Sequence, residues 1–158
     1  MADYFLQITG VAGESRDAKH KGWIDVEAWS WGETNAAPVS PGSGSSAGRV
    51  SIQDLSISTR FSKASPQLFL ACATGQHLKE AKLVAVHSGA MQQEFLTWTF
   101  SDVLVSSYQT GGAGGDLVTD QVSLNFAKLK VEYKAQNPDG SLGAAVTAGF
   151  DVKTNKKL

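Results

Sequence analysis

Residues 23–33 read WIDVEAWSWGE, and this stretch decides the fold class. β-Branched and aromatic residues alternate here with polar ones, which indicates a strand with one buried face. Ile24 and Val26 share one face of that strand. Trp29 and Trp31 lie on the other face, so the alternation changes phase partway. Because side chains alternate with period two, the change indicates either a bulge or a strand that buries first one face and then the other.

Two further segments change phase in the same way. In residues 50–61 the apolar positions change phase after Ile52, and in residues 122–133 they change after Phe126. Strands that bend at the corners of a closed or nearly closed barrel would give this pattern. A stretch that extends beyond the core would then pack its second face on another copy of the chain.

The sequence predicts one helix, at residues 65–75, which read SPQLFLACATG. Ser65 is the expected N-cap, Pro66 the first helical residue and Gly75 the C-terminal stop. The apolar side that should cover a sheet consists of Leu68, Phe69 and Cys72.

Most of the remaining chain has strand character. The expected strands are residues 4–8, 81–87, 94–100, 103–108 and 150–154. The NPDG sequence of Asn137–Gly140 is typical of a hairpin turn. We therefore expect one domain over residues 1–158 that is mainly β, namely a small β-barrel of two antiparallel sheets with one short flanking α-helix and a long extended loop.

Composition and charge exclude several function classes. The 158 residues include 14 Lys and Arg and 15 Asp and Glu, for a net charge of −1. This balance lacks the basic excess expected of a nucleic-acid partner. No stretch approaches the ~18 apolar residues of a membrane helix, and the first residues are not typical of a secretory signal peptide, so we expect synthesis in the cytoplasm without membrane insertion. The single cysteine, Cys72, excludes an internal disulfide.

Motifs for catalysis are weak. GSSAG at residues 44–48 and GSGSSA at residues 42–47 match nucleophile-elbow and dinucleotide patterns, but no strand precedes them and no helix follows. His20, His77 and His87 lack metal-ligand spacing. We expect no enzyme activity, no metal and no cofactor.

The connection over residues 35–49 is rich in Gly, Ser, Ala and Pro and carries no charge before Arg49. Such a long connection inside a small domain is uncommon. It is either a surface loop or an arm that orders against a neighbouring molecule.

Five segments, in this order, resemble the haemolysin-coregulated protein (Hcp) family, the tube subunit of bacterial type VI secretion systems. They are GESRDAKHKGWIDVEAWSWG (13–32), DLSISTRFSKASPQLFLACATGQH (54–77), DVLVSSYQTGG (102–112), VSLNFAKLKVEY (122–133) and GFD (149–151).

The resemblance implies a subunit of homohexameric rings that stack into an exported tube inside a contractile sheath, with a spike protein at its tip. In a closed ring each subunit uses two different surfaces. In the family, the lumen of the tube carries small effector proteins. The resemblance also implies that the protein is made in the cytoplasm and then secreted to the extracellular space or into a target cell.

The resemblance also suggests roles for particular residues. Expected lumen and effector contacts are Ser30, Gly111, Gly112 and Ala113. Trp29 and Trp31 would point inward as core or interface aromatics, with Ser30 facing the channel. Expected ring contacts in the loop are Asn35, Pro38, Pro41, Gly44 and Arg49.

Other functions stay open at this point. The chain could be the tail-tube subunit of a phage-like contractile particle or a family member specialised as a cargo carrier. A monomeric ligand-binding β-barrel fits the pattern too, because small barrels can hold one ligand. A hydrolase fits least.

Overall fold

The computed structural model describes residues 1–36, 49–89 and 92–158. Its elements in chain order are β1 (Ala2–Ile8), β2 (Ile24–Ser30), β3 (Glu33–Asn35), β4 (Val50–Ile52), β5 (Leu55–Arg60), α1 (Ala64–Thr74), β6 (His77–His87), β7 (Glu94–Gly111), β8 (Thr119–Asn125), β9 (Lys128–Gln136), β10 (Leu142–Asp151) and β11 (Lys156–Lys157). Most predicted strands correspond to an observed strand, with different bounds; two of them, residues 94–100 and 103–108, are one strand, and residues 150–154 overlap β10 only at Phe150 and Asp151.

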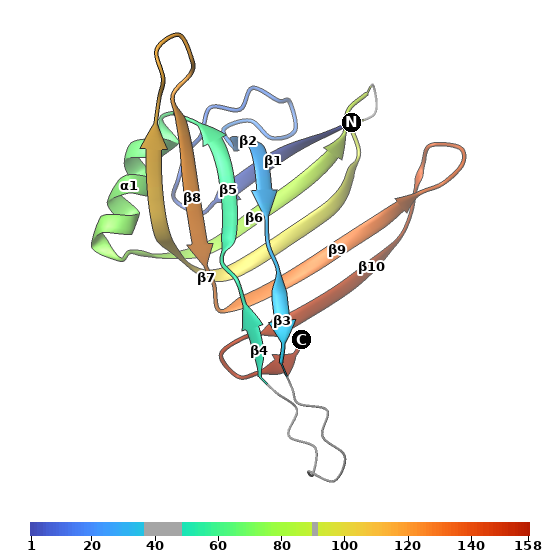
Figure 1. Ribbon diagram of the computed structural model, residues 1–158. Helices are drawn as coiled ribbons and strands as arrows, with labels where there is room; N and C mark the ends of the chain where they lie inside the picture. The colour runs from blue at the N-terminus through green and yellow to red at the C-terminus, as the bar shows by residue number, and fades with distance from the viewer. Residues whose placement is uncertain (37–48, 90–91) are drawn as a thin grey trace.

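The main sheet closes on itself. Its strand order is β11-β10-β9-β7-β6-β1-β2-β5-β8, and an additional pairing of β7 with β8 joins the end of the sheet back to its middle. The strands β6, β1, β2, β5, β8 and β7 therefore form a closed antiparallel barrel, with β9 to β11 extending from it (Figure 1). Strands β3 and β4 form a second antiparallel sheet. The predicted fold class is confirmed.

Strand β7 serves both parts of the main sheet. Its first part pairs with β9 up to Ser101, and its second part pairs with β8 from Leu104. Between them Asp102 has a φ of 53°, a conformation uncommon outside glycine. The sequence predicted two strands here, residues 94–100 and 103–108, where the structure has one strand that bends and changes partner.

Side chains fill the barrel interior. The fully buried residues include Leu55, Ile57, Phe100 and Leu124, each at most 1% exposed. Helix α1 packs against β7 and contributes Leu68 to the same core. Such close packing favours a rigid scaffold over a hollow container.

The structure explains the three phase changes locally. In β2 a bulge lies between Val26 and Ala28, where the register to β5 shifts. The other two changes fall at breaks between strands, from β4 to β5 and from β8 to β9. On the second face of β1 and β6, Phe5, Val84 and Val86 form a small buried cluster, and Trp23 of the chain's own loop packs against it. Burial on both faces there needs no second copy.

The helix departs from its prediction at its N-terminus. Gly75 does end it, in the left-handed conformation with a φ of 66°. Ser65, however, is not the N-cap, because the helix begins at Ala64 with Lys63 at the capping position. Phe69 is 58% exposed and so lies off the buried side, which is formed by Ala64, Ser65, Leu68 and Ala71.

The last predicted strand, residues 150–154, starts too late. Strand β10 begins at Leu142, directly after the NPDG turn, and ends at Asp151. A turn follows, in which the backbone N–H of Thr154 donates to a carboxylate oxygen of Asp151. This bond holds the pKa of Asp151 below its usual value.

Candidate functional surface and family

The outer face of four barrel strands forms a small, polar surface. In the register of β2, β5, β8 and β7, residues directly opposite one another form rows that point to the same side of the sheet. One row consists of Ser30, Ser56, Ser123 and Ser107, and the next consists of Ala28, Ser58, Gln121 and Gln109. We call these eight residues the serine face.

The bulge in β2 creates this arrangement. Without it, Trp29 would continue the outward phase of Asp25; with it, Ser30 is exposed and Trp29 is half-buried against the core. Trp29 makes an edge contact with Tyr4 at a centroid distance of 6.0 Å. Trp31 likewise packs on the core, 5.3 Å from Trp98. Both tryptophans thus pack on the core, although Trp29 also borders the depression on the serine face.

The serine face is hollowed. A depression of about 300 Å³ is lined by Ser30, Ser56, Ser58 and Gln121, among others, and the Gln121 amide donates to Ser58 Oγ at 2.8 Å. A larger depression of about 600 Å³ adjoins the β7–β8 turn.

The second depression brings the predicted glycine-rich turn next to the serine face. Gly111, Gly112 and Ala113 line it together with Glu27 and Arg60. Arg60 Nε donates to Glu27 Oε1 at 3.1 Å, so these two exposed charges offset each other. Asp116 also lines this depression, so the surface offers hydroxyl, amide and backbone groups and one carboxylate besides the Arg60–Glu27 pair. Such a set suits contact with another chain more than proton transfer or nucleophilic attack.

The predicted loop contacts are only partly described. Asn35 lies in β3, where it pairs with Val50 of β4. The Arg49 guanidinium donates to the backbone oxygen of Lys153 at 3.4 Å. Pro38, Pro41 and Gly44 lie outside the described residues, as do the GSSAG and GSGSSA segments.

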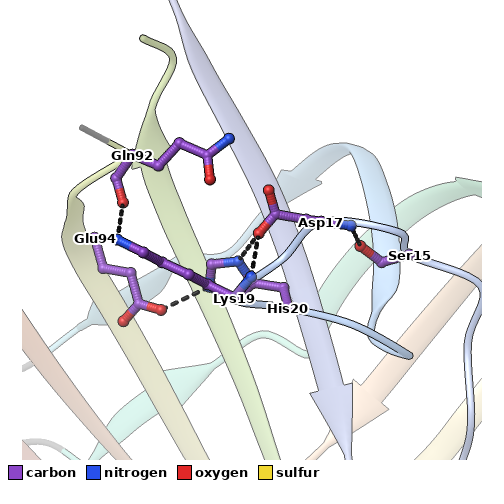
Figure 2. Close-up of polar contacts among 6 residues, drawn as sticks. All are labelled: Ser15, Asp17, Lys19, His20, Gln92 and Glu94. Carbon is purple, nitrogen blue, oxygen red and sulfur yellow. Dashed lines mark hydrogen bonds and ion pairs between the residues drawn. The ribbon is translucent and has the colours of Figure 1, made fainter. Parts of the chain in front are cut away.

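Sequence reasoning missed a buried histidine. His20 is fully buried between Asp17 and Glu94, with Nδ1 at 2.6 Å from Asp17 Oδ2 and Nε2 at 2.6 Å from Glu94 Oε1 (Figure 2). Its ring stacks on Phe5 at 4.5 Å and meets Trp23 edge-on. The sequence could have suggested only the contact with Asp17, which is three residues from His20, because Glu94 is 74 residues away. The histidine here joins two carboxylates, and no metal-holding group of His, Cys, Asp or Glu occurs in the described ranges.

A second buried polar group was also missed. Asp120, fully buried, accepts hydrogen bonds from Ser65 Oγ at 2.5 Å and from the Tyr108 hydroxyl at 3.1 Å. Burial, followed by the hydrogen bond to Asp120, raises the pKa of Tyr108. These bonds tie α1 to β7 and β8, which makes the group structural.

Besides the terminal residues Met1 and Leu158, large apolar side chains are exposed in two sets. Tyr133 and Val146, 46% and 70% exposed, pair across β9 and β10. The other set is Phe61, Phe69, Leu70, Leu117 and Val118, which lie on α1 and around the β7–β8 turn. Figure 1 has α1 and this turn on one side of the barrel and the β9–β10 hairpin on the other. In the part of the chain that the structure describes, no helix has the length and apolar character needed to cross a membrane.

Comparison with known proteins identifies the family of this chain. Residues 5–133 match the family model described as "Type VI secretion system effector, Hcp". The chain belongs to the Hcp family. It is 43% identical to Protein hcp1 of Pseudomonas aeruginosa over 156 residues, which covers 97% of this chain and 96% of that protein.

Solved structures of Hcp proteins share the whole fold. Hcp1 from Salmonella typhimurium superposes with a TM-score of 0.84 at 36% identity, covering 99% of both chains. A structure described as a type six secretion system protein reaches a TM-score of 0.93 at 29% identity and covers both chains fully. Hcp proteins are secreted, structural proteins of the type VI system and are not a known enzyme family.

Proposed function

We propose that this chain is the repeating subunit of a type VI secretion tube. Six copies associate into a ring, the rings stack into a tube, and the lumen carries small effector proteins. The observation that carries the proposal is the serine face, a hollowed surface across four strands whose side chains are uncharged and mostly short. A channel that passes varied protein cargo needs a wall that binds no single charge pattern strongly.

In this proposal the serine face lines the lumen. Ser30 and the adjoining Gly111, Gly112 and Ala113 are the effector contacts. Their short side chains leave backbone and hydroxyl groups accessible to cargo, whereas Trp29 and Trp31 on the opposite side support the strand from the core.

The two exposed apolar sets form the ring contact. A ring in which each subunit uses two different surfaces needs a pair of complementary patches on separate sides of the subunit. The Tyr133 and Val146 pair on one side and the set around Leu117 on the other meet that requirement. Exposed apolar groups gathered on a face are typical of interaction surfaces.

The remaining partners follow from the tube. The loop of residues 35–49 is the arm that contacts a neighbouring subunit or the next ring, through Asn35, Pro38, Pro41, Gly44 and Arg49. The contractile sheath surrounds the tube and a spike protein sits at its tip. The protein is made in the cytoplasm and leaves the cell when the sheath contracts.

The lumen assignment is tested with Ser30→Arg. The variant places a long cation in the middle of the serine face, so an effector that co-purifies with the wild-type ring should be lost while the ring still forms in native mass spectrometry. Gln7→Arg, an exposed position on β1 away from this face, is the matched control and should retain the effector. Unchanged retention in Ser30→Arg would contradict the lumen assignment.

The ring contact is tested with Val146→Lys and Leu117→Lys. Both positions are highly exposed, so a folded monomer should tolerate the lysines, with unchanged circular dichroism. Each lysine would need to be desolvated in the ring contact, and each variant alone should shift the ring toward monomers. A ring that survives both substitutions would exclude these surfaces.

The tail tube of a phage-like contractile particle is the second candidate, because the same ring-forming geometry serves it. Secretion into the medium by a strain with an active type VI system separates the two, since a phage-like tube would be released inside whole particles after lysis. A monomeric ligand-binding barrel is disfavoured by the filled interior around Phe100 and Leu124.

A further inference from the structure

A small pocket lies where β3 meets the outer strands of the main sheet, β7, β9 and β10 (Figure 1). Its volume is about 160 Å³. Neither the serine face nor the proposed effector contacts include any of its residues. The lining includes Trp31, Glu33, Trp98, Leu129, Val131 and Phe150.

Two tryptophans form the aromatic wall of the pocket. The ring centroids of Trp31 and Trp98 are 5.3 Å apart, and the ring planes meet at 47°. Both side chains are half-buried, and their Nε1 atoms are buried without a hydrogen-bond partner in the described residues. The polar edge of each indole is therefore turned away from solvent, and the exposed parts of both rings are carbon. A ligand here meets hydrocarbon and aromatic surface, which attracts cations as well as apolar groups.

Glu33 is the one charged side chain in the pocket lining. It is exposed, and within the described ranges it forms no ion pair. Lys157 lies opposite Phe150 in the β10–β11 register and so points to the pocket side of the sheet, yet it does not pair with Glu33. Apolar walls with one unpaired carboxylate at their edge suit a ligand that has an aliphatic stem and a cationic end.

We propose that this pocket receives a lysine side chain from a second copy of the chain. The lysine methylenes pack on Trp31 and Trp98, and the ammonium pairs with Glu33. A cavity of about 150 Å³ can hold a benzene molecule, which is similar in size to a lysine side chain. This occupant requires the neighbouring copies of the proposed tube, so the inference rests on that proposal.

The position of the pocket favours a second copy as the source. On β9 and β10 its residues continue in register to the exposed Tyr133–Val146 pair, and residues in such rows point to one side of the sheet. One apolar strip therefore joins the pocket to the pair that we assign to the ring contact. A neighbouring subunit that covers this pair also lies beside the pocket. The strip consists of Leu129, Val131, Tyr133, Val146, Ala148 and Phe150.

Lysine is the cation that a second copy offers most often. Eleven of the 14 basic residues are lysines. Lys134 pairs with Glu132 at 3.5 Å, and no other lysine in the part of the chain that the structure describes forms an ion pair with a carboxylate. Lysine ammonium groups of a neighbouring copy are therefore available to Glu33, whereas Arg60 is already paired with Glu27 of its own chain.

Carbodiimide cross-linking of the assembled full-length protein tests the occupant. The reagent activates a carboxylate, an amine in contact displaces the reagent as its urea, and an amide then joins the two side chains. Rings are reassembled from equal amounts of ¹⁴N and ¹⁵N chains, so a link between subunits joins chains of different label in about half of the cases. Mass spectrometry of the digested rings should show Glu33 joined to a lysine with this mixed labelling.

The Glu132–Lys134 pair is the internal control for the reaction, because it lies within one chain and should never carry mixed labels. Rings that show the control link but no mixed Glu33 link would overturn the pocket proposal and leave the ring proposal intact. Glu33 joined only to Lys157 of its own chain would overturn it as well. A protein that never assembles would contradict both proposals.

Glu33→Gln tests the role of the charge independently. The amide keeps the shape of an exposed side chain, so the variant should fold as the wild type does. Loss of the ion pair should raise the concentration at which half of the rings dissociate about two- to fivefold, measured by mass photometry over a dilution series.

The salt dependence of that concentration separates an ion pair from a purely structural effect. Salt should weaken the wild-type ring more than the Glu33→Gln ring, because salt screens an exposed ion pair. Glu80→Gln, at an exposed position on β6, is the matched control and should behave as wild type. Equal dissociation and equal salt dependence in Glu33→Gln and wild type would overturn the proposal.

Discussion

The substitution Ser65→Asp tests which role Ser65 has: the helix N-cap that the sequence predicts, or the buried hydrogen-bond donor that the structure shows. If Ser65 were an N-cap, aspartate would serve equally well, because Asp and Ser are among the preferred capping residues. In the structure the Ser65 hydroxyl instead donates to Asp120, and both residues are at most 1% exposed. The substitution places a second carboxyl against a buried carboxylate.

The cost follows from the protonation that this pair requires. Two carboxylates in contact cannot both stay ionised, so one must hold a proton at pH 7, three pH units above an ordinary carboxyl pKa, which costs about 4 kcal/mol. The helix N-terminus returns at most about 1 kcal/mol. We therefore expect Ser65→Asp to lower the free energy of unfolding by about 3–4 kcal/mol at pH 7, and by about 1.4 kcal/mol less for each pH unit below that.

Urea unfolding followed by tryptophan fluorescence at pH 7, 6 and 5 measures this effect. All samples need the same subunit concentration, because assembly adds to apparent stability. Ser62→Asp is the matched control. Ser62 Oγ accepts the backbone N–H of Ala64 at 3.2 Å, so an aspartate carboxylate there should keep this bond and change stability by less than about 1 kcal/mol at every pH. A Ser65→Asp protein as stable as wild type at pH 7 would refute the reasoning.

Four other substitutions have defined outcomes. Gly13→Ala should strongly destabilise the loop and raise its proteolysis rate, because the added Cβ would lie 2.3 Å from the carbonyl oxygen of Trp23; resistance equal to wild type would contradict this. Leu68→Ala should cost about 2–5 kcal/mol in chemical denaturation, whereas Phe69→Ala, at an exposed position, should cost under about 1 kcal/mol. The hydrogen bond from the buried histidine lowers the pKa of Asp17, so the contribution of Asp17 to the free energy of unfolding is complete above about pH 4 and is lost as pH falls below that. Asp17→Asn should therefore reduce the loss of stability that the protein shows below about pH 4. An unchanged loss of stability in this variant would exclude the contribution.

Features set by local pattern were predictable. The phase change at Trp29 indicated either a bulge or a strand that buries first one face and then the other, and the structure has a bulge between Val26 and Ala28. Gly75 ends the helix because only a residue without a side chain adopts its φ of 66° at no cost. The position of Ser30 on the face opposite Trp29 followed from the same alternation.

Features set by long-range partners were not predictable. Ser65 matches an N-cap by its spacing to Gly75, but its hydroxyl is used by Asp120, 55 residues away. His20 lies in a polar stretch with no apolar periodicity, and its burial depends on Glu94 and on the outer face of β1. One sequence does not record which distant side chains meet. The serine face needed the register of four strands before its rows could be recognised.

Native mass spectrometry of the full-length protein tests the central proposal most directly, together with negative-stain images of the same sample. Six copies of the 16.7 kDa chain should give a particle of about 100 kDa with a central hole. In Val146→Lys that particle should give way to the folded 16.7 kDa monomer. A wild-type protein that stays monomeric at every concentration reached would contradict the tube proposal.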